Sequence, residues 1–172
     1  MKRKLIIFDF DDTLFPTTEF TNSPYTFFRT KKYRITNLND LIGKIFKKLD
    51  EEGYDCIIVS NGDNRWLNLI STYLPSMYRV KTFSSRRMYE SKRVRHNLWK
   101  FYAYLNLFTG DYINYDKYIG VGDRNSDNEA IINACNVMKK DVSFYKFKED
   151  PTFDELVKEL EFFYNLIKAD QL

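Results

Sequence analysis

The sequence predicts an α/β fold in which a mainly parallel, five-stranded sheet lies between two layers of helices. Its 172 residues, of which 44% are hydrophobic and 30% charged, are typical of one globular domain. Short apolar runs alternate with stretches of helical apolar spacing, which favours a three-layer α/β architecture. No repeat, linker or shift in composition divides residues 1–172, so we expect a single domain.

The first part of the chain begins with a buried strand. Residues 5–8 form a continuous apolar run, which is typical of a strand covered on both faces. Residues 14–36 lack an apolar period and contain Pro24, so we expect a loop or flap there. Helical spacing of apolar residues follows at 38–49, and Gly53 is placed to end that helix.

The remaining elements alternate between strand and helix. The patterns predict strands at 56–59, 80–83, 118–121 and 142–145, and helices at 66–74, 94–105, 127–134 and 152–167. Thr152 and Glu155 have the spacing of a capping box, which marks the start of the last helix. Parallel strands end at one edge of their sheet, where α/β proteins bind their ligands.

Composition excludes several kinds of site. The single histidine, His96, excludes Ser-His-Asp triads and histidine-rich zinc sites, so catalysis would depend on carboxylates, lysine, hydroxyls or a hard metal ion. Cys56 and Cys135 lie in apolar stretches, and we expect buried free thiols. The apolar run at 5–8 is too short for a signal peptide or a membrane span, so we expect a cytoplasmic or nuclear protein.

Positive charge is concentrated in one segment of a chain whose net charge is only +3. Residues 81–100 contain seven lysines and arginines but a single acid, Glu90. Such a run is typical of a solvated helix face. Alternatively, it forms a surface that attracts phosphorylated or nucleic-acid partners.

Reactive side chains follow three of the predicted strands. Asp9 and Asp11 come directly after the first strand, and alternation would place both carboxylates on one side of an extended chain. Two such carboxylates repel each other unless a cation joins them, and Mg²⁺ is the usual hard cation. Ser60 and Asn61 begin a turn that suits a phosphate oxygen, and Asp123 follows the fourth strand. Each segment alone is also compatible with ordinary turn residues.

Together, these segments resemble the signature motifs of the haloacid dehalogenase (HAD) superfamily, over essentially the whole chain. Residues 9–13 (Asp-Phe-Asp-Asp-Thr) match its Asp-x-Asp-x-Thr motif, Ser60 matches its second motif, and residues 122–127 match Gly-Asp-x-x-x-Asp. The superfamily also has a lysine before the last motif. Lys92 and Lys100 are candidates, and the spacing to the last motif favours Lys100.

The resemblance implies a Rossmann-like HAD core with strand order 3-2-1-4-5 and no large cap domain. Segments 84–90 and 99–100 are similar to a little-characterised group of the superfamily in protists and large viruses. Caps in the superfamily enter after the first or second motif, and both intervals are too short here to contain one. An open site would admit a large or exposed phosphorylated substrate, including a macromolecule.

The resemblance also implies that the chain is a Mg²⁺-dependent phosphomonoester hydrolase, a HAD-type phosphatase. Asp9 would form an aspartyl-phosphate, and Asp11 would act as general acid and then as general base. The phosphoryl group would be held by Ser60, Asn61 and Lys100.

The implied metal site shares residues with the catalytic ones. Mg²⁺ would be bound by the Asp9 side chain, the Asp11 main-chain carbonyl group and Asp123. Asp127 and Thr13 would support these ligands without being ligands themselves.

Two other functions fit the sequence. One is a non-catalytic HAD fold that serves as a binding or regulatory module, because fold and motif do not guarantee turnover. The other is a phosphatase that processes nucleic-acid ends, which only the basic segment 81–100 favours.

Overall fold

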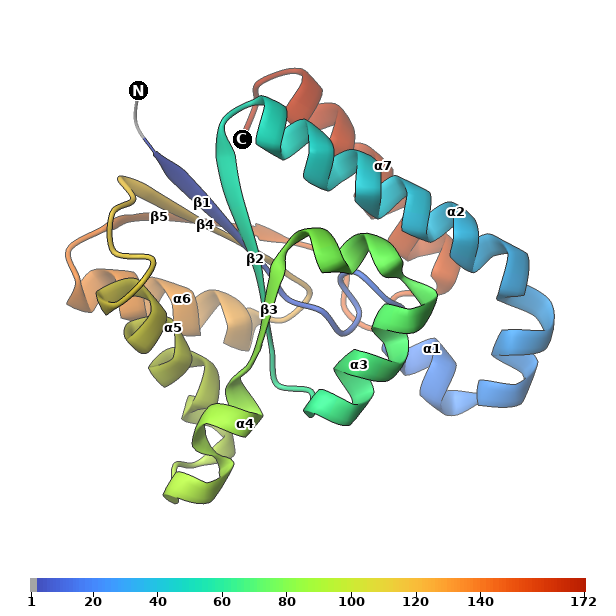
Figure 1. Cartoon of the computed structure of the whole chain (residues 1–172), viewed down its shortest axis with the longest axis horizontal. Helices are drawn as coiled ribbons and strands as arrows, with labels where there is room; N and C mark the ends of the chain where they lie inside the picture. Colours follow the sequence, from blue (N-terminus) through green and yellow to red (C-terminus); the bar gives the residue numbers. More distant parts are fainter. Residues whose placement is uncertain (1–2) are drawn as a thin grey trace.

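Five parallel strands form one sheet in the computed structural model, which describes residues 3–172 (Figure 1). The strands are β1 (Lys4–Phe8), β2 (Tyr54–Ser60), β3 (Lys81–Ser84), β4 (Lys117–Gly122) and β5 (Asp141–Lys146). Their order is β3-β2-β1-β4-β5, and every neighbouring pair is parallel. The predicted fold class and strand order are confirmed.

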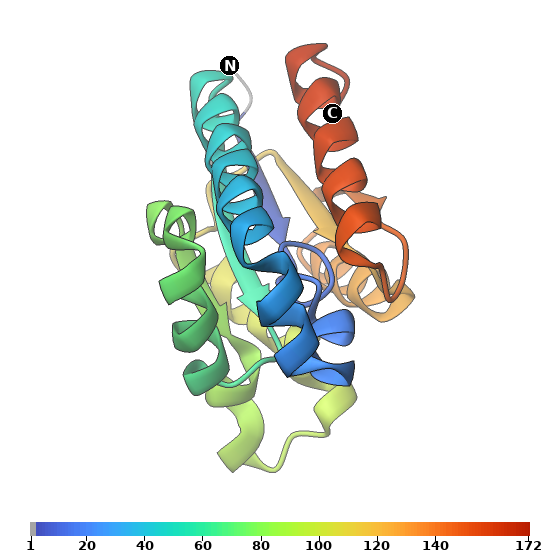
Figure 2. The same cartoon turned by 90° about the vertical axis from the view of Figure 1, so that its right-hand side faces the viewer.

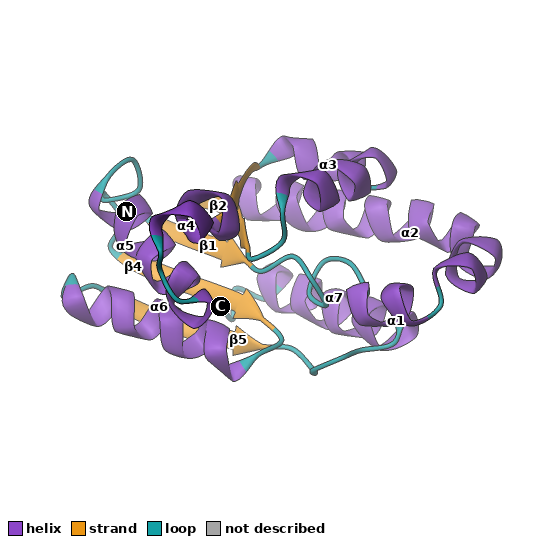
Figure 3. Ribbon diagram, turned by 90° about the horizontal axis from the view of Figure 1, so that it is seen from below, coloured by secondary structure: helices purple, strands orange, loops and turns teal. Residues whose placement is uncertain are grey.

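Helices cover both faces of the sheet and produce three layers (Figure 3). The helices are α1 (Thr17–Asn22), α2 (Pro24–Glu51), α3 (Asn64–Tyr73), α4 (Ser85–Tyr89), α5 (Trp99–Thr109), α6 (Asn125–Val137) and α7 (Phe153–Lys168). The 3₁₀ turns are η1 (Pro75–Arg79), η2 (Glu90–Lys92) and η3 (His96–Leu98). Apolar residues of α2, α3 and α7 pack against one face, and those of α5 and α6 against the other. Figure 2 shows α2 and α7 side by side over the first face.

The central strand β1 explains why its sequence is an unbroken apolar run. Ile6 and Phe8 belong to the core under α2 and α7, whereas Leu5 and Ile7 belong to the core under α5 and α6. All four side chains are buried. A strand with helices on both sides has no solvent-facing position that would select polar residues.

The segment 14–36 differs most from its prediction as a loop or flap. It contains α1 and the first part of α2, a single helix of 28 residues. Pro24 does not break this helix, because it occupies the first turn, where no hydrogen bond from a backbone N–H is lost. Phe27 packs against Phe20 of α1 and Phe153 of α7. The apolar contacts of this segment therefore come from distant elements, and periodicity within the segment could not reveal them.

The helix over 94–105, predicted from the apolar spacing of Val94, Leu98, Phe101, Tyr102 and Leu105, begins at Trp99 instead and buries a different set of residues. Val94 precedes η3, and Leu98 and Tyr102 are 38% and 40% exposed. The buried residues of α5 are Trp99, Lys100, Ala103, Tyr104, Leu107 and Phe108. Apolar and aromatic residues occur on both sides of α5, so their spacing did not identify the buried side.

Several local predictions are confirmed. Gly53 follows α2 with a left-handed φ of 79°, and the predicted capping box of Thr152 and Glu155 begins α7. Both cysteines are free thiols, but only Cys135 is buried as predicted, whereas Cys56 is half-buried. None of the described helices has both the length and the apolarity needed to cross a membrane.

Candidate active site

The carboxyl ends of β1, β2 and β4 bring the predicted site residues to one edge of the sheet. The parallel register pairs Phe8 with Ile58 on β2 and with Val121 on β4, so the residues that follow these strands meet. The Asp9 N–H donates to the Val121 carbonyl oxygen at 2.8 Å. Buried polar side chains gather at this edge: Asp9, Asp12, Thr13, Ser60, Lys100, Asp123 and Asp127.

The Lys100 ammonium group connects two carboxylates of this cluster. Its Nζ atom lies 2.7 Å from Asp9 Oδ1 and 2.6 Å from Asp127 Oδ1, and all three side chains are buried. Lys100 and Asp127 come from the first turns of α5 and α6. The other candidate, Lys92, is exposed in η2, where its ammonium group lies over the Tyr89 ring. Of the two lysines, the structure therefore places Lys100 in the site.

Burial and charge act in opposite directions on this ion pair. Burial raises the pKa of Asp9 well above its ordinary value, although the Lys100 ammonium group lowers it. Burial lowers the pKa of Lys100, but Asp127 and Asp9 raise it by more, so the net pKa is well above its ordinary value. Lys100 is therefore a fixed positive charge in a site that excludes most solvent.

Three buried carboxylate oxygens in the site accept no hydrogen bond from the described residues. They are both oxygens of Asp123 and the Oδ2 atom of Asp127. Burial, with repulsion from Asp127 and Asp12, raises the pKa of Asp123 to about 7, although Arg124 lowers it. One oxygen each from Asp9, Asp123 and Asp127 lie within 4.8 Å of one another. Converging carboxylates without donors are the ligand set that a hard divalent cation prefers, so these residues fit Mg²⁺.

This carboxylate cluster differs from the predicted metal ligands at one position. Asp9 and Asp123 are common to both sets, but the third carboxylate is Asp127, which we predicted as a supporting residue. Asp127 fits both roles, that of a supporting residue and that of a metal ligand. Its Oδ1 atom accepts from Lys100, while its Oδ2 atom lacks a donor within residues 3–172. The role of the Asp11 main-chain carbonyl group stays a prediction.

The Asp11 side chain belongs to a hydrogen-bond network separate from that of the Asp9 carboxylate, and a cation shared by the two carboxylates stays a prediction. Its Oδ1 atom accepts from Trp66 Nε1 at 2.8 Å and from Thr17 Oγ1 at 2.7 Å. Its Oδ2 atom lies 3.4 Å from Ser60 Oγ. β1 ends at Phe8, before Asp9, so the alternation of an extended chain does not continue to Asp11. The roles of Trp66 and Thr17 were not predicted, because Trp66 was expected only as an apolar position of the helix over 66–74 and Thr17 lies in the segment expected to be a loop or flap.

The turn after β1 is closed by Asp12 and Thr13. Asp12 has a left-handed φ of 58°, which aspartate adopts more readily than most residues. Its carboxylate accepts from the Thr18 N–H at 2.9 Å and from the Thr18 hydroxyl at 2.5 Å. The Thr13 N–H donates to the Phe10 carbonyl oxygen at 3.2 Å, and the Thr13 side chain is fully buried. Thr13 therefore lies in the turn that directs Asp11 toward α1 and α3.

The turn after β2 is shaped by Ser60, Asn61 and Gly62. The Gly62 N–H donates to Ser60 Oγ at 2.9 Å. A Cβ atom on Gly62 would lie 3.2 Å from that oxygen and 3.1 Å from the Trp66 ring, so a side chain would crowd the turn. The Ser85 hydroxyl lies 3.1 Å from the Ser60 carbonyl oxygen and also bonds to the Asn61 side chain. The start of α4 thus supports the turn that would bind phosphate.

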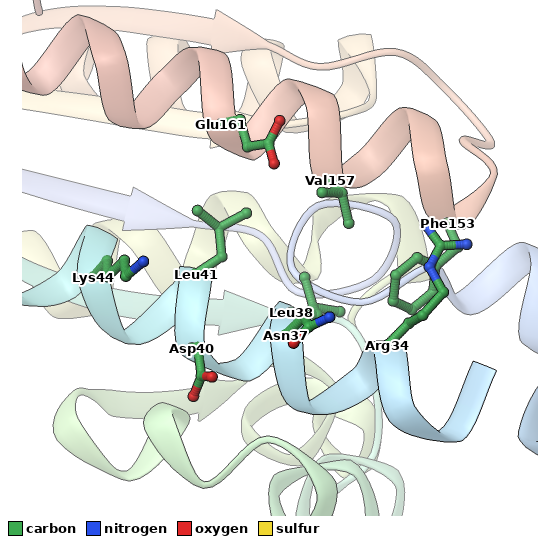
Figure 4. A pocket seen from close by; sticks show the side chains of 9 residues that line it. All are labelled: Arg34, Asn37, Leu38, Asp40, Leu41, Lys44, Phe153, Val157 and Glu161. Carbon is green, nitrogen blue, oxygen red and sulfur yellow. The ribbon is translucent and has the colours of Figure 1, made fainter.

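A cavity of about 380 Å³ lies away from this edge, between α2 and α7 (Figure 4). Arg34 lies on one side of it, stacked 4.6 Å from the Phe153 ring centroid and paired with Asp154. Glu161 and Lys44 lie at its other end (Figure 4). Because α2 and α7 cover a face of the sheet, this cavity is separate from the strand ends and is not part of the candidate site.

Comparisons with known proteins support the fold. No protein-family model and no curated protein match the sequence. The chain is similar to the HAD domain of the effector protein Lem4 from Legionella pneumophila, with a TM-score of 0.58 and 14% identity over 96% of this chain and 94% of that one. A structure of the same domain described as an inactive mutant gives a TM-score of 0.56 and 14% identity, with both chains covered completely. The protist and viral group stays a prediction, but the chain has the fold of a HAD domain.

Proposed function

We propose that this chain is a Mg²⁺-dependent phosphomonoester hydrolase that acts through an aspartyl-phosphate intermediate on Asp9. The observation that carries the proposal is the buried Lys100 ammonium group between Asp9 and Asp127, beside the oxygens of Asp123, which accept no hydrogen bond from the described residues. A nucleophilic carboxylate, a fixed cation and a ligand set for a divalent cation are together what phosphoryl transfer requires.

Each proposed step uses a residue at the carboxyl edge of the sheet. Asp9 attacks phosphorus with the oxygen that is not bonded to Lys100, the bond to the ester oxygen breaks, and the leaving oxygen takes a proton from Asp11. Asp11 then takes a proton from water, whose oxygen attacks phosphorus and releases inorganic phosphate from Asp9. Ser60, Asn61 and Lys100 hold the phosphoryl oxygens during both steps and offset their charge.

The metal ion of this proposal would be held by Asp9, Asp123 and Asp127, with the Asp11 main-chain carbonyl group as the further ligand that the resemblance implies. Both oxygens of Asp123 and the Oδ2 atom of Asp127 accept no hydrogen bond from the described residues, which supports this assignment. Bound Mg²⁺ supplies positive charge that offsets the charge on Asp9 and on the phosphoryl group.

The alternative function is a non-catalytic binding or regulatory module. A site that had lost catalysis would be expected to lack a reactive group or to keep its groups apart, whereas Asp9 and Lys100 are in direct contact here. The test is hydrolysis of an aryl phosphate, with Mg²⁺ or with EDTA, by the wild type and by Asp9→Asn. We expect hydrolysis only by the wild type with Mg²⁺. A wild type that binds phosphorylated compounds without turnover would favour the binding module.

A second candidate function, removal of phosphate from nucleic-acid ends, is favoured by the segment 86–98. Ser85 and Lys100 hold the ends of this segment at the site, and it extends beyond the carboxyl ends of the strands, at the bottom of Figures 1 and 2. It contains five lysines and arginines and one acid, Glu90, which pairs with Arg86. Such a surface would attract a polyanionic substrate, with an affinity that falls as salt rises.

Charge reversal within this segment separates the substrate classes. Lys92→Glu with Arg95→Glu should lower kcat/KM on a 5′-phosphorylated oligonucleotide and leave an aryl phosphate nearly unaffected, because both side chains are exposed. The matched control reverses Lys44 and Lys47, which are exposed in the C-terminal half of α2. A larger loss on a phosphorylated acidic peptide than on the oligonucleotide would favour a phosphoprotein substrate instead.

A further inference from the structure

We propose that Trp66 and Thr17 position the Asp11 carboxyl group so that its Oδ2 atom faces the turn after β2, which is proposed to bind phosphate. The proposal rests on the proposed function, in which Asp11 gives a proton to the leaving oxygen. Trp66 and Thr17 act through Asp11 and are positioning residues.

The two donors converge on the same oxygen of Asp11. Trp66 Nε1 lies 2.8 Å from Oδ1, and Thr17 Oγ1 lies 2.7 Å from it. An indole N–H can only donate, so Oδ1 is an acceptor in both protonation states of Asp11. A protonated carboxyl group has one hydroxyl and one carbonyl oxygen, and the carbonyl oxygen is the better acceptor for two donors. The two donors at Oδ1 therefore favour the form of Asp11 that carries its proton on Oδ2.

The Oδ2 atom is on the side where the proposed reaction needs that proton. It lies 3.4 Å from Ser60 Oγ and 3.5 Å from the position that a Cβ atom would take on Gly62. Ser60 and Gly62 form the turn that is proposed to hold the phosphoryl group, and the leaving oxygen is bonded to the same phosphorus. As the bond from phosphorus to this oxygen breaks, the Oδ2 proton moves to it and leaves Asp11 as a carboxylate.

Packing keeps the Trp66 indole in place. Its ring centroid lies 5.9 Å from that of Phe15 and 5.4 Å from that of Phe20, and the Trp66 backbone N–H donates to Asp63 at the start of α3. Phe20 and Thr17 both belong to α1. One short helix thus supplies one donor to Asp11 and an aromatic surface for the other. A catalytic group that is held in one orientation increases the reaction rate, because its side chain loses less rotational freedom in the transition state.

The decisive measurement is the dependence of each variant on the leaving group. Trp66→Phe keeps an aromatic ring and removes the N–H donor. Phenyl phosphate has a basic leaving group that needs a proton, whereas 2,4-dinitrophenyl phosphate has one that leaves without it. General acid catalysis contributes about 10²–10⁴-fold, so we expect kcat/KM to fall at least about tenfold on phenyl phosphate and less than about twofold on the dinitrophenyl ester. Thr17→Val removes the other donor and should show the same selective loss.

The matched control is Trp99→Phe, because the Trp99 indole donates to the Val94 carbonyl oxygen at 3.0 Å and not to a carboxylate. Any effect of this substitution should be equal on the two substrates. A Trp66→Phe enzyme whose kcat/KM falls equally on both esters, or on neither ester, overturns the proposal. If Trp66→Phe does not fold, Thr17→Val decides by the same criterion.

A spectroscopic measurement tests the contact without relying on turnover. The chain has two tryptophans, so ¹⁵N NMR should show two indole N–H signals. Asp11→Ala should shift the Trp66 signal and leave the Trp99 signal in place. An unmoved Trp66 signal overturns the contact even in an active enzyme. If the Trp66 signal shifts but the wild type hydrolyses neither ester, the proposed function and its proton transfer are overturned, while the contact stands.

Discussion

Asp123→Asn should make the metal-free protein more stable at pH 8, although it should abolish the response to Mg²⁺. Asp123 is 1% exposed, and its oxygens accept no hydrogen bond from the described residues. Without a bound cation, its charge is buried and close to the carboxylates of Asp127 and Asp12, and the Arg124 guanidinium group, 3.9 Å from Oδ2, offsets this repulsion only in part. Asparagine has nearly the same shape and carries no charge, so the substitution removes this repulsion.

The pKa of Asp123 sets the size and the sign of the effect. Burial and the neighbouring carboxylates raise it from 3.8 to about 7. A carboxyl group whose pKa rises on folding binds its proton more tightly in the native state, so stability is greatest at low pH and falls between about pH 4 and pH 7. The whole shift of the Asp123 pKa corresponds to a loss of roughly 4 kcal/mol in the free energy of unfolding. Roughly 2–3 kcal/mol of this loss develops between pH 5 and pH 8. The unpaired amide of the variant costs about 1–3 kcal/mol, but that cost does not change with pH.

Urea unfolding in EDTA at pH 5 and pH 8 measures this effect. The free energy of unfolding of the variant, relative to the wild type, should increase by roughly 2–3 kcal/mol between the two pH values. At pH 8, millimolar Mg²⁺ should raise the Tm of the wild type by mass action and leave that of the variant unchanged. Asp50→Asn, an exposed carboxylate in α2, is the control. A relative stability that is the same at both pH values would refute the raised pKa, and an equal Mg²⁺ response would refute the metal ligand.

Other substitutions test the catalytic residues separately. Asp9→Asn should keep the fold, as judged by circular dichroism, and lose turnover, because an amide is a poor nucleophile; wild-type activity would remove Asp9 from that role. Lys100→Ala should lower aryl phosphate hydrolysis by about 10²–10³-fold while Lys92→Ala is nearly normal, and the reverse ranking would contradict the placement of Lys100. Gly62→Ala should lower kcat/KM by up to about 10²-fold by displacing the turn, and unchanged kinetics would show that the turn tolerates a side chain.

The strands and their order could be predicted because each depends on a local pattern. β1 is an unbroken apolar run since both of its faces are covered, and such a run is visible without knowledge of its partners. The residues that follow the strands were predictable for the same reason, because parallel strands end at one edge. Asp9, Ser60 and Asp123 therefore needed only the strand assignments to be brought together.

The segment 14–36 and the buried face of α5 depend instead on tertiary contacts. Phe20 and Phe27 pack against each other and against rings from α3 and α7, which no spacing within the segment reveals. The network of Asp11 was missed with this segment, because Thr17 and the aromatic support of Trp66 both come from it. The prediction of 14–36 as a loop and the missed network of Asp11 thus have the same cause, the dependence of this segment on tertiary contacts.

The separation of Asp9 from Asp11 gives the two carboxylates different chemical surroundings. Asp9 contacts the Lys100 ammonium group, which favours its ionised form against the effect of burial, and Mg²⁺ bound at the neighbouring carboxylates would add further positive charge. The side-chain donors at Asp11 are all neutral: an indole N–H and two hydroxyl groups, from Trp66, Thr17 and Ser60. A reaction that needs one carboxylate as nucleophile and another as proton donor requires such a difference between neighbours. The left-handed turn at Asp12 and the helix α1 produce it, by directing two aspartates only two positions apart into separate networks.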